Sequence, residues 1–536
     1  MEKVFEKNET NWSEHSASQV ENAGERRKSV ADEVTELSSI EATAASKAAW
    51  LISATVSTGG FLFGYDTGYI SSVLVTVGAS LGHELLSSEE ELVTSLTSGG
   101  ALIGAVFAGL MADRFGRKLP IWAACVVFVI GTVLQTAAYS VVQFAVGRFV
   151  VGLGVGSAAM IVPLYIGEIA PAKYRGRMIA FNNMSVTLGQ LIASAIGAGL
   201  AQVPGEAWRG TVGIGALPAI TLGIMLFWCP ESPRQLVARG RLDAAERVLL
   251  QVYPTSSPEQ RHAKVKSIEM SIHEATASMG NESLGTSFLR IFRTPPTGRA
   301  VLTACLIMAI SQLGGFNTLM YYSARLFAIV GFSNATAVAI TVSGTNFIFS
   351  IVNLFLVDRF GRRILLVVTV LGMSLCMLTA AVAFHWIPIN LQTLELEGDN
   401  VGGAGIIILV AIIVYVACFS SGVATIAWIG TELIPLEVRA LGTMLNTVTC
   451  WSTNIIIAST FLSMMKGMTP SGAFGFYSAI CFIGWIFIVI CYPDVKGMPL
   501  EAIREVFMHG FGRAYSKQWQ KENKDAPKVV QQTFGH

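Results

Sequence analysis

Long apolar stretches alternate with short polar loops along most of the chain. A stretch of about 20 apolar residues forms a helix that can cross the ~30 Å hydrocarbon core of a bilayer. Such stretches lie at about 49–76, 92–111, 119–139, 142–166, 178–201, 208–229, 300–325, 335–357, 364–386, 404–433, 441–464 and 471–492. The pattern predicts an all-α membrane protein with twelve transmembrane helices.

Positive charge in the short loops predicts how the chain is oriented. Lysine and arginine gather after the second, fourth and eighth stretches, whereas loops 78–91 and 386–403 contain neither. Because Lys and Arg stay on the cytoplasmic side, both termini and segment 230–299 are expected there. The first 45 residues contain no secretory signal pattern, so the first span is expected to act as its own signal.

The chain is expected to divide into two six-helix halves, because it repeats itself. Asp113–Lys118 (DRFGRK) recurs as Asp358–Arg363 (DRFGRR), and the spacing Glu168, Pro171, Arg175 recurs as Glu432, Pro435, Arg439. The predicted parts are an N-terminal tail, a first half, a cytoplasmic linker with short helices, a second half and a C-terminal tail, at 1–47, 48–229, 230–299, 300–492 and 493–536. Two such halves imply a substrate site at their interface near the midplane, and alternating access by rocking.

Composition agrees with lipid as the main solvent and removes other classes of protein. Hydrophobic residues make up 52% of the chain, charged residues 14%, and the net charge is +1. Neither a basic stripe nor a ligand-like cysteine spacing occurs, so no nucleic acid, metal or cofactor is expected. No motif of a hydrolase or nucleotide-binding enzyme occurs either, so the chain is not expected to be an enzyme.

Asp66 lies within the first apolar stretch, among Gly60, Gly64 and Gly68. A charged side chain at that depth is costly unless it is paired or used, so it marks a candidate functional site. Arg148 falls at a comparable depth in the fourth stretch, so the two can meet if those helices are neighbours. Burial favours the protonated carboxyl and a nearby arginine favours the charged one. The pair is therefore expected to couple proton binding to transport; the alternative is a static ion pair.

Neutral amides and aromatic residues on the inner helices suit a hydroxyl-rich solute, because amides both donate and accept hydrogen bonds without burying net charge. The amide candidates are Asn183, Gln190, Gln312, Asn317, Asn346 and Asn454. Trp428 and Trp451 can supply apolar faces, and Tyr321 and Tyr322 can close the site from outside. The alternative for each amide is a helix-to-helix hydrogen bond, which membrane bundles use routinely.

Charged residues at the cytoplasmic helix ends are predicted to form a gate, in addition to setting topology. Salt bridges there would break when the protein opens inward, and so bias a two-state equilibrium. The gating candidates are Asp113, Arg114, Arg117, Glu168, Arg175, Asp358, Arg359, Arg362, Glu432 and Arg439.

Taken together, these motifs resemble the sugar porters of the major facilitator superfamily. The resemblance rests on the two DRFGR loops, Pro163–Arg177 (PLYIGEIAPAKYRGR), Pro230–Arg234 (PESPR) and Asn317–Ser323 (NTLMYYS), and covers about residues 48–502. Within that family, Gly64–Leu74 (GYDTGYISSVL) is most similar to fungal myo-inositol transporters. Proton symporters of the family carry aspartate at the position of Asp66, whereas facilitators commonly carry asparagine.

Some positions depart from the family pattern. Ser311 replaces the first of two adjacent glutamines, Ser420–Trp428 (SSGVATIAW) lacks the usual prolines, and Cys450 stands where asparagine often precedes the tryptophan. These positions match expected substrate contacts, so they bear on the identity of the substrate more than on transport itself.

The resemblance implies a proton-coupled symporter that imports myo-inositol or a similar polyol across the plasma membrane, functional as a monomer in the lipid bilayer. The alternatives are a hexose or other small-polyol carrier, and a non-transporting nutrient sensor. A sensor is expected to carry a long cytoplasmic tail, and the segment after about Arg504 is short and basic.

Overall fold

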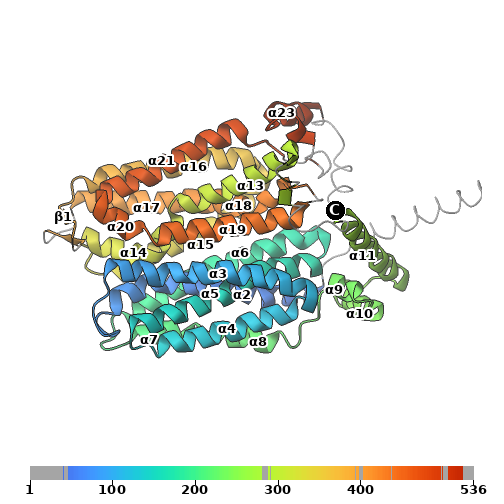
Figure 1. The fold of residues 1–536 in the computed structure, drawn as a ribbon, viewed down its shortest axis with the longest axis horizontal. Helices are drawn as coiled ribbons and strands as arrows, with labels where there is room; N and C mark the ends of the chain where they lie inside the picture. Colours follow the sequence, from blue (N-terminus) through green and yellow to red (C-terminus); the bar gives the residue numbers. More distant parts are fainter. Residues whose placement is uncertain are drawn as a thin grey trace, which may run out of the picture.

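The computed structural model describes residues 40, 46–279, 288–289, 291, 293–392, 394–397, 402–435, 438–495, 498 and 505–522. Its helices form two stacked layers, the earlier part of the chain in one and the later part in the other (Figure 1). The layers meet where α6 packs on α15, α3 on α19 and α2 on α14.

The first layer contains four long helices after α2 and a broken one. Their bounds are α2 Lys47–Thr76, α3 Ser87–Phe115, α4 Lys118–Thr136, α5 Val141–Ile169, α6 Ala172–Leu200, α7 Trp208–Ile214 and α8 Ala216–Met225. The second layer contains α13 Pro295–Leu313, α14 Phe316–Val330, α15 Ala335–Phe360, α16 Arg362–Phe384, α17 Gly403–Ser421, α18 Val423–Ile429, the 3₁₀ turn η1 Gly430–Leu433, α19 Arg439–Ala458, α20 Phe461–Gly467 and α21 Thr469–Cys491.

In the described part of the chain, nine helical segments are long and apolar enough to cross a membrane, and the bent pair α19–α20 makes a tenth. Helix α2 has 30 residues and is not one of these ten, because its glycine, serine, threonine and Asp66 residues lower its mean hydropathy. The pair α7–α8 is interrupted at Gly215. With these two, the structure has the twelve membrane segments that the hydrophobic pattern predicts.

Four expected spans are broken where each was predicted as one helix. The breaks fall at Gly215, at Gly314–Gly315, at Gly422 and after Ala458. Gly315 adopts φ +93°, a left-handed conformation that ends one helix and starts the next. Helix α14, which begins after Gly315, ends at Val330, five residues beyond the predicted end of the span at 325. Glycine in an apolar run leaves the hydropathy pattern unchanged, so the pattern does not reveal such breaks.

Three linker helices lie at one end of the bundle, hereafter the linker end: α9 Pro233–Ala238, α10 Leu242–Val252 and α11 Pro258–Met279 (Figure 1). The apolar face of α10 is buried through Ala245, Val248 and Leu249, whereas Leu242 at its start is 37% exposed. Helix α23, Arg513–Glu522, lies at the same end.

The opposite end, hereafter the far end, carries α20 and a small hairpin (Figure 1). Strand β1, Ile389–Asn390, pairs antiparallel with β2, Glu395–Leu396. This hairpin lies in a loop outside the spans and is a minor departure from the all-helical prediction.

Glycines set how closely α2 approaches α6. A Cβ at Gly64 would collide with the carbonyl of Val186, and one at Gly189 would collide with the carbonyl of Phe61. Backbones that approach this closely leave no room for a side chain. The contact fixes the helix that carries Asp66 against the rest of its half.

Candidate functional site

Asp66 and Arg148 form a buried ion pair. Arg148 Nη1 lies 2.6 Å from Asp66 Oδ1. Arg148 is 0% exposed and Asp66 is 2% exposed. The Arg148 Nε also donates to the carbonyl of Val93 on α3, at 3.1 Å. The contact expected from the depths of the two residues is present. Because a buried charge left unpaired is costly, loss of either partner would destabilise the other.

Two residues that the sequence analysis did not select complete this centre. The Tyr69 hydroxyl donates to Asp66 Oδ1 at 2.9 Å and accepts from Arg148 Nη1 at 3.0 Å. It also lies 2.9 Å from the Gln135 side-chain oxygen on α4. The signal for Tyr69 is its position three residues after Asp66, on the same side of a helix. Gln135 comes from a distant helix and carries no such signal.

Gln190, Asn346 and Ser420 form a first amide cluster across the two halves. Asn346 Nδ2 on α15 donates to Gln190 Oε1 on α6 at 2.6 Å, and the Ser420 hydroxyl on α17 donates to Asn346 Oδ1 at 2.6 Å. All three side chains are buried. The cluster joins the halves at mid-depth, where two-half carriers bind their substrates.

A second amide cluster gathers around Gln312 and Asn454. Asn317 Nδ2 donates to Gln312 Oε1 at 2.5 Å, and Asn454 Nδ2 donates to the same oxygen at 3.4 Å. Asn454 Oδ1 accepts from the Ser98 hydroxyl at 3.0 Å and from the Tyr321 hydroxyl at 3.3 Å. Ser98 belongs to the first half, so this cluster also crosses the interface.

The remaining predicted substrate residues have different surroundings. Trp451 is buried, with its ring edge-on to Phe63 of the other half at 5.6 Å. The Tyr322 hydroxyl donates to the carbonyl of Ala458 at 2.8 Å. Trp428 is 38% exposed and Asn183 is half-buried, and both lie outside the two amide clusters. The neighbouring Asn182 is buried against Gly60 of α2.

Hydrogen bonds also join the halves at the far end. Both carboxylate oxygens of Glu91 on α3 accept from Ser463 on α20, one from the backbone N–H at 2.7 Å and one from the hydroxyl at 2.6 Å. Ser71 on α2 lies 2.9 Å from the Ser323 hydroxyl and accepts from the N–H of Ala324 at 2.8 Å. The far end is therefore closed in this structure.

At the linker end, Arg117 binds Glu168 within the first half. Its Nη2 lies 2.8 Å from Glu168 Oε1, and its Nη1 donates to the carbonyl of Ala112 at 2.5 Å. The backbone N–H groups of Arg117 and Lys118 donate to the Glu231 carboxylate at 2.9 and 3.4 Å. Glu231 thus caps the N-terminus of α4, a role that the sequence analysis did not assign.

The other gating candidates are spread over the same end. Arg114, Arg175 and Arg359 have exposed side chains, and Arg362 is half-buried. The side chains of Asp113, Asp358, Glu432 and Arg439 lie outside the described part of the structure. The proposed inter-span gating role of this set stays a prediction.

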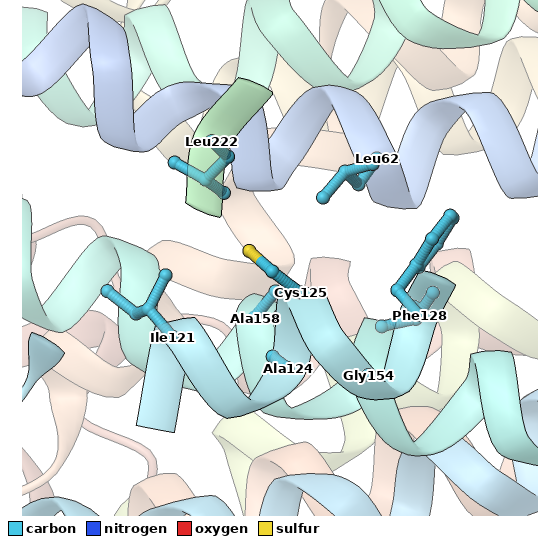
Figure 2. A pocket seen from close by; sticks show the side chains of 9 residues that line it. Leu62, Ile121, Ala124, Cys125, Phe128, Gly154, Ala158 and Leu222 are labelled. Atoms are coloured by element: carbon cyan, nitrogen blue, oxygen red, sulfur yellow. The ribbon is translucent and has the colours of Figure 1, made fainter. Parts of the chain in front are cut away.

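An apolar pocket lies within the first half, apart from these polar clusters (Figure 2). Leu62, Ile121, Cys125, Phe128 and Leu222 are among its lining residues. Since these side chains offer neither amides nor hydroxyls, the pocket does not suit a polyol or sugar.

The chain belongs to the family described as sugar (and other) transporters, whose model matches residues 52–507. It is therefore a transporter and not an enzyme, and the predicted membership is confirmed. It is 39% identical to myo-inositol transporter 1 of Candida albicans over 487 residues, 90% of this chain and 88% of that protein. It is 40% identical to myo-inositol transporter 1 of Cryptococcus neoformans over 477 residues, 89% of this chain and 84% of that one.

Solved structures confirm the fold class. The partially occluded inward-open xylose transporter XylE from E. coli matches with a TM-score of 0.71 at 24% identity, over 84% of this chain and 99% of that chain. The inward-open form of XylE matches with a TM-score of 0.70, also at 24% identity, over 85% of this chain and 99% of that one. The fold is that of the major facilitator superfamily.

Proposed function

We propose that the chain imports myo-inositol or a similar polyol together with protons, by alternating access. The observation that carries the proposal is the buried Asp66–Arg148 pair, with its 2.6 Å contact, beside polar clusters that join the two halves. A buried carboxyl can bind and release a proton, and the amides match vicinal hydroxyls. The names of the similar fungal transporters support myo-inositol as the solute.

Tyr321 connects the proposed proton site with the proposed substrate site. Its hydroxyl donates to Asn454 Oδ1 at 3.3 Å, and its buried side chain lies near Asp66 and Arg148. A solute that takes over the hydrogen bonds of Asn454 would move Tyr321 and so change the surroundings of the ion pair. This route supports coupling between proton and solute, since each ligand then alters the affinity for the other.

The proposed cycle uses the two ends of the bundle in alternation. The contacts of Glu91 with Ser463 and of Ser71 with Ser323 hold the far end shut. We assign the far end to the outside and the linker end to the cytoplasm, on the positive charge of the linker-end loops. The gating arginines and acids would then close the inner end when the far end opens. We also propose the plasma membrane as the location, a functional monomer, and the five-part division of the chain given above.

Uptake of labelled myo-inositol tests the proposal, in cells that lack their own carriers, at acidic and neutral external pH. Symport predicts stimulation by acid and collapse with a protonophore, and Asp66→Asn should abolish accumulation against a gradient. Concentrative uptake by Asp66→Asn equal to that of the wild type would contradict the role of the carboxyl. Competition by a panel of sugars and polyols distinguishes a myo-inositol carrier from the alternative, a hexose or other small-polyol carrier.

A further inference from the structure

Tyr69 lies at the centre of the ion-pair site but belongs to neither charge. Its hydroxyl contacts Asp66 Oδ1 at 2.9 Å, Arg148 Nη1 at 3.0 Å and Gln135 Oε1 at 2.9 Å, and the residue is 2% exposed. We propose that Tyr69 is a positioning residue for proton coupling: its hydroxyl, held by Gln135, stabilises the charged form of Asp66 and thereby sets the pH at which the carrier binds its proton. This inference rests on the proposed function.

The number of donors and acceptors around Tyr69 determines which group receives its hydroxyl hydrogen. A tyrosine hydroxyl has one hydrogen to donate, so it cannot serve Asp66 and Gln135 Oε1 together. With the Gln135 oxygen facing Tyr69, Gln135 Nε2 is buried without a hydrogen-bond partner in the described residues. Reversing the amide exchanges its oxygen and nitrogen in nearly the same space. Gln135 Nε2 then donates to the Tyr69 oxygen, and the tyrosine hydrogen goes to Asp66.

The surroundings of Asp66 make this one hydrogen bond consequential. Arg148 approaches Asp66 from α5, the neutral Tyr321 lies near it on α14, and Tyr69 binds it from its own helix. Helix α3 faces the site with the carbonyl of Val93, which holds Arg148, and α4 faces it with the neutral Gln135. Asp66 is nearly out of contact with water, so water cannot replace the hydrogen that Tyr69 supplies.

Removing the hydroxyl should therefore make Asp66 bind a proton more readily. A hydrogen bond donated to a carboxylate favours its charged form, and loss of such a bond corresponds to a shift on the order of one pH unit. Tyr69→Phe should move the pH of half-maximal uptake upward by about that amount. Because the proton is then released less readily inside, the maximal rate should fall. A purely structural role would lower the rate without moving the pH of half-maximal uptake.

The test is the pH profile of labelled myo-inositol uptake by full-length Tyr69→Phe, compared with the wild type. Tyr65→Phe is the matched control, because Tyr65 lies one turn earlier on α2, is equally buried and donates to the carbonyl of Thr211 at 2.8 Å. We expect a shifted profile for Tyr69→Phe and an unshifted one for Tyr65→Phe. Gln135→Met should shift the pH profile in the same direction by a smaller amount, because Tyr69 keeps its hydroxyl but loses the hydrogen bond with the Gln135 amide.

An unshifted profile in Tyr69→Phe overturns this inference, provided that Asp66→Asn has lost its acid stimulation. Acid-stimulated accumulation by Asp66→Asn instead overturns the proposed function itself, so the two failures are distinguishable. If Tyr69→Phe transports too slowly for a profile, infrared titration of the purified protein replaces it. The protonated-carboxyl band that Asp66→Asn removes should titrate at higher pH in Tyr69→Phe, and titration at the wild-type pH would contradict the inference.

Discussion

Glu91 and Ser463 connect the two halves of the protein at its far end. The Glu91 carboxylate accepts the backbone N–H of Ser463 at 2.7 Å and its hydroxyl at 2.6 Å. Ser463 lies in the first turn of α20, so a side chain from the first half caps a helix of the second. Such carboxylate caps satisfy N–H groups that the helix itself leaves unpaired. Helix α20 begins just after a bend of 41° from α19.

Loss of this cap should favour opening of the far end. Glu91→Ala removes both hydrogen bonds, and bonds to a charged group contribute roughly 1.5–3 kcal/mol in favourable sites. We expect the ratio of far-end-open to far-end-closed molecules to rise about tenfold. Spin labels at Glu84 and Met468, both exposed at this end, report the change as longer distances between the halves.

Glu89→Ala is the control for this experiment, because Glu89 is a neighbour on α3 that binds His83 within the same half. Its distance distribution should equal that of the wild type. Equal distributions in Glu91→Ala would show that the cap does not hold the far end shut.

Asn346→Ala should weaken solute binding without changing the response to pH. It removes the bonds to Gln190 and Ser420, at 2.6 Å each, from the first amide cluster. We expect KM for myo-inositol to rise roughly tenfold, as for loss of one or two neutral hydrogen bonds. The control is Asn353→Ala on the same helix, where Asn353 is buried but donates to Thr425 within the second half. A KM for Asn346→Ala no higher than that of the control would remove this cluster from the substrate site.

Arg117→Ala should destabilise the folded protein. Arg117 and Glu168 are 8% and 7% exposed at the side chain, and removal of one partner from a buried pair costs about 3–5 kcal/mol. The melting temperature of Arg117→Ala in lipid nanodiscs should therefore fall by several degrees. Arg114→Ala should melt like the wild type, because Arg114 is exposed and its carbonyl keeps the bond to Arg239. Equal melting of the two variants would contradict the structural role of the pair.

Gly100→Ala and Gly99→Ala form a test of the helix contact between α3 and α5. A Cβ at Gly100 would collide with the carbonyl of Phe149, whereas one at Gly99 meets nothing within 4 Å. We expect Gly100→Ala to reduce the yield of folded, monodisperse protein severalfold and Gly99→Ala to leave it unchanged. Size-exclusion chromatography of both variants checks the difference, and equal yields would mean that the helices separate at little cost.

The sequence predicted the spans from the length of the apolar runs, and it predicted that Asp66 and Arg148 lie at a comparable depth, so that they can meet if their helices are neighbours. The amides Gln190, Gln312, Asn346 and Asn454 were also recognisable, since polar side chains are rare in apolar helices. Their sorting into two clusters was not, because it depends on how helices from different halves face each other.

Other features had only a weak signal, as at Tyr69, or none. A tyrosine such as Tyr69 in an apolar run resembles a packing residue, and Gln135 becomes informative only when α4 is placed beside α2. Glu91 lies near the start of α3, where charged residues are common. Its hydrogen bond to Ser463, 372 positions later, was therefore not predictable from the sequence. The breaks at Gly315 and Gly422 were missed because hydropathy does not register backbone angles.

Electrical recording tests the central claim most directly. A neutral polyol carried with a proton moves one positive charge, so myo-inositol added outside at acidic pH should evoke an inward current. The current should shrink as external pH rises and should be absent in Asp66→Asn, because asparagine cannot take up a proton. A wild-type protein that takes up labelled myo-inositol without current, or an Asp66→Asn variant with the full current, would contradict proton coupling through this carboxyl.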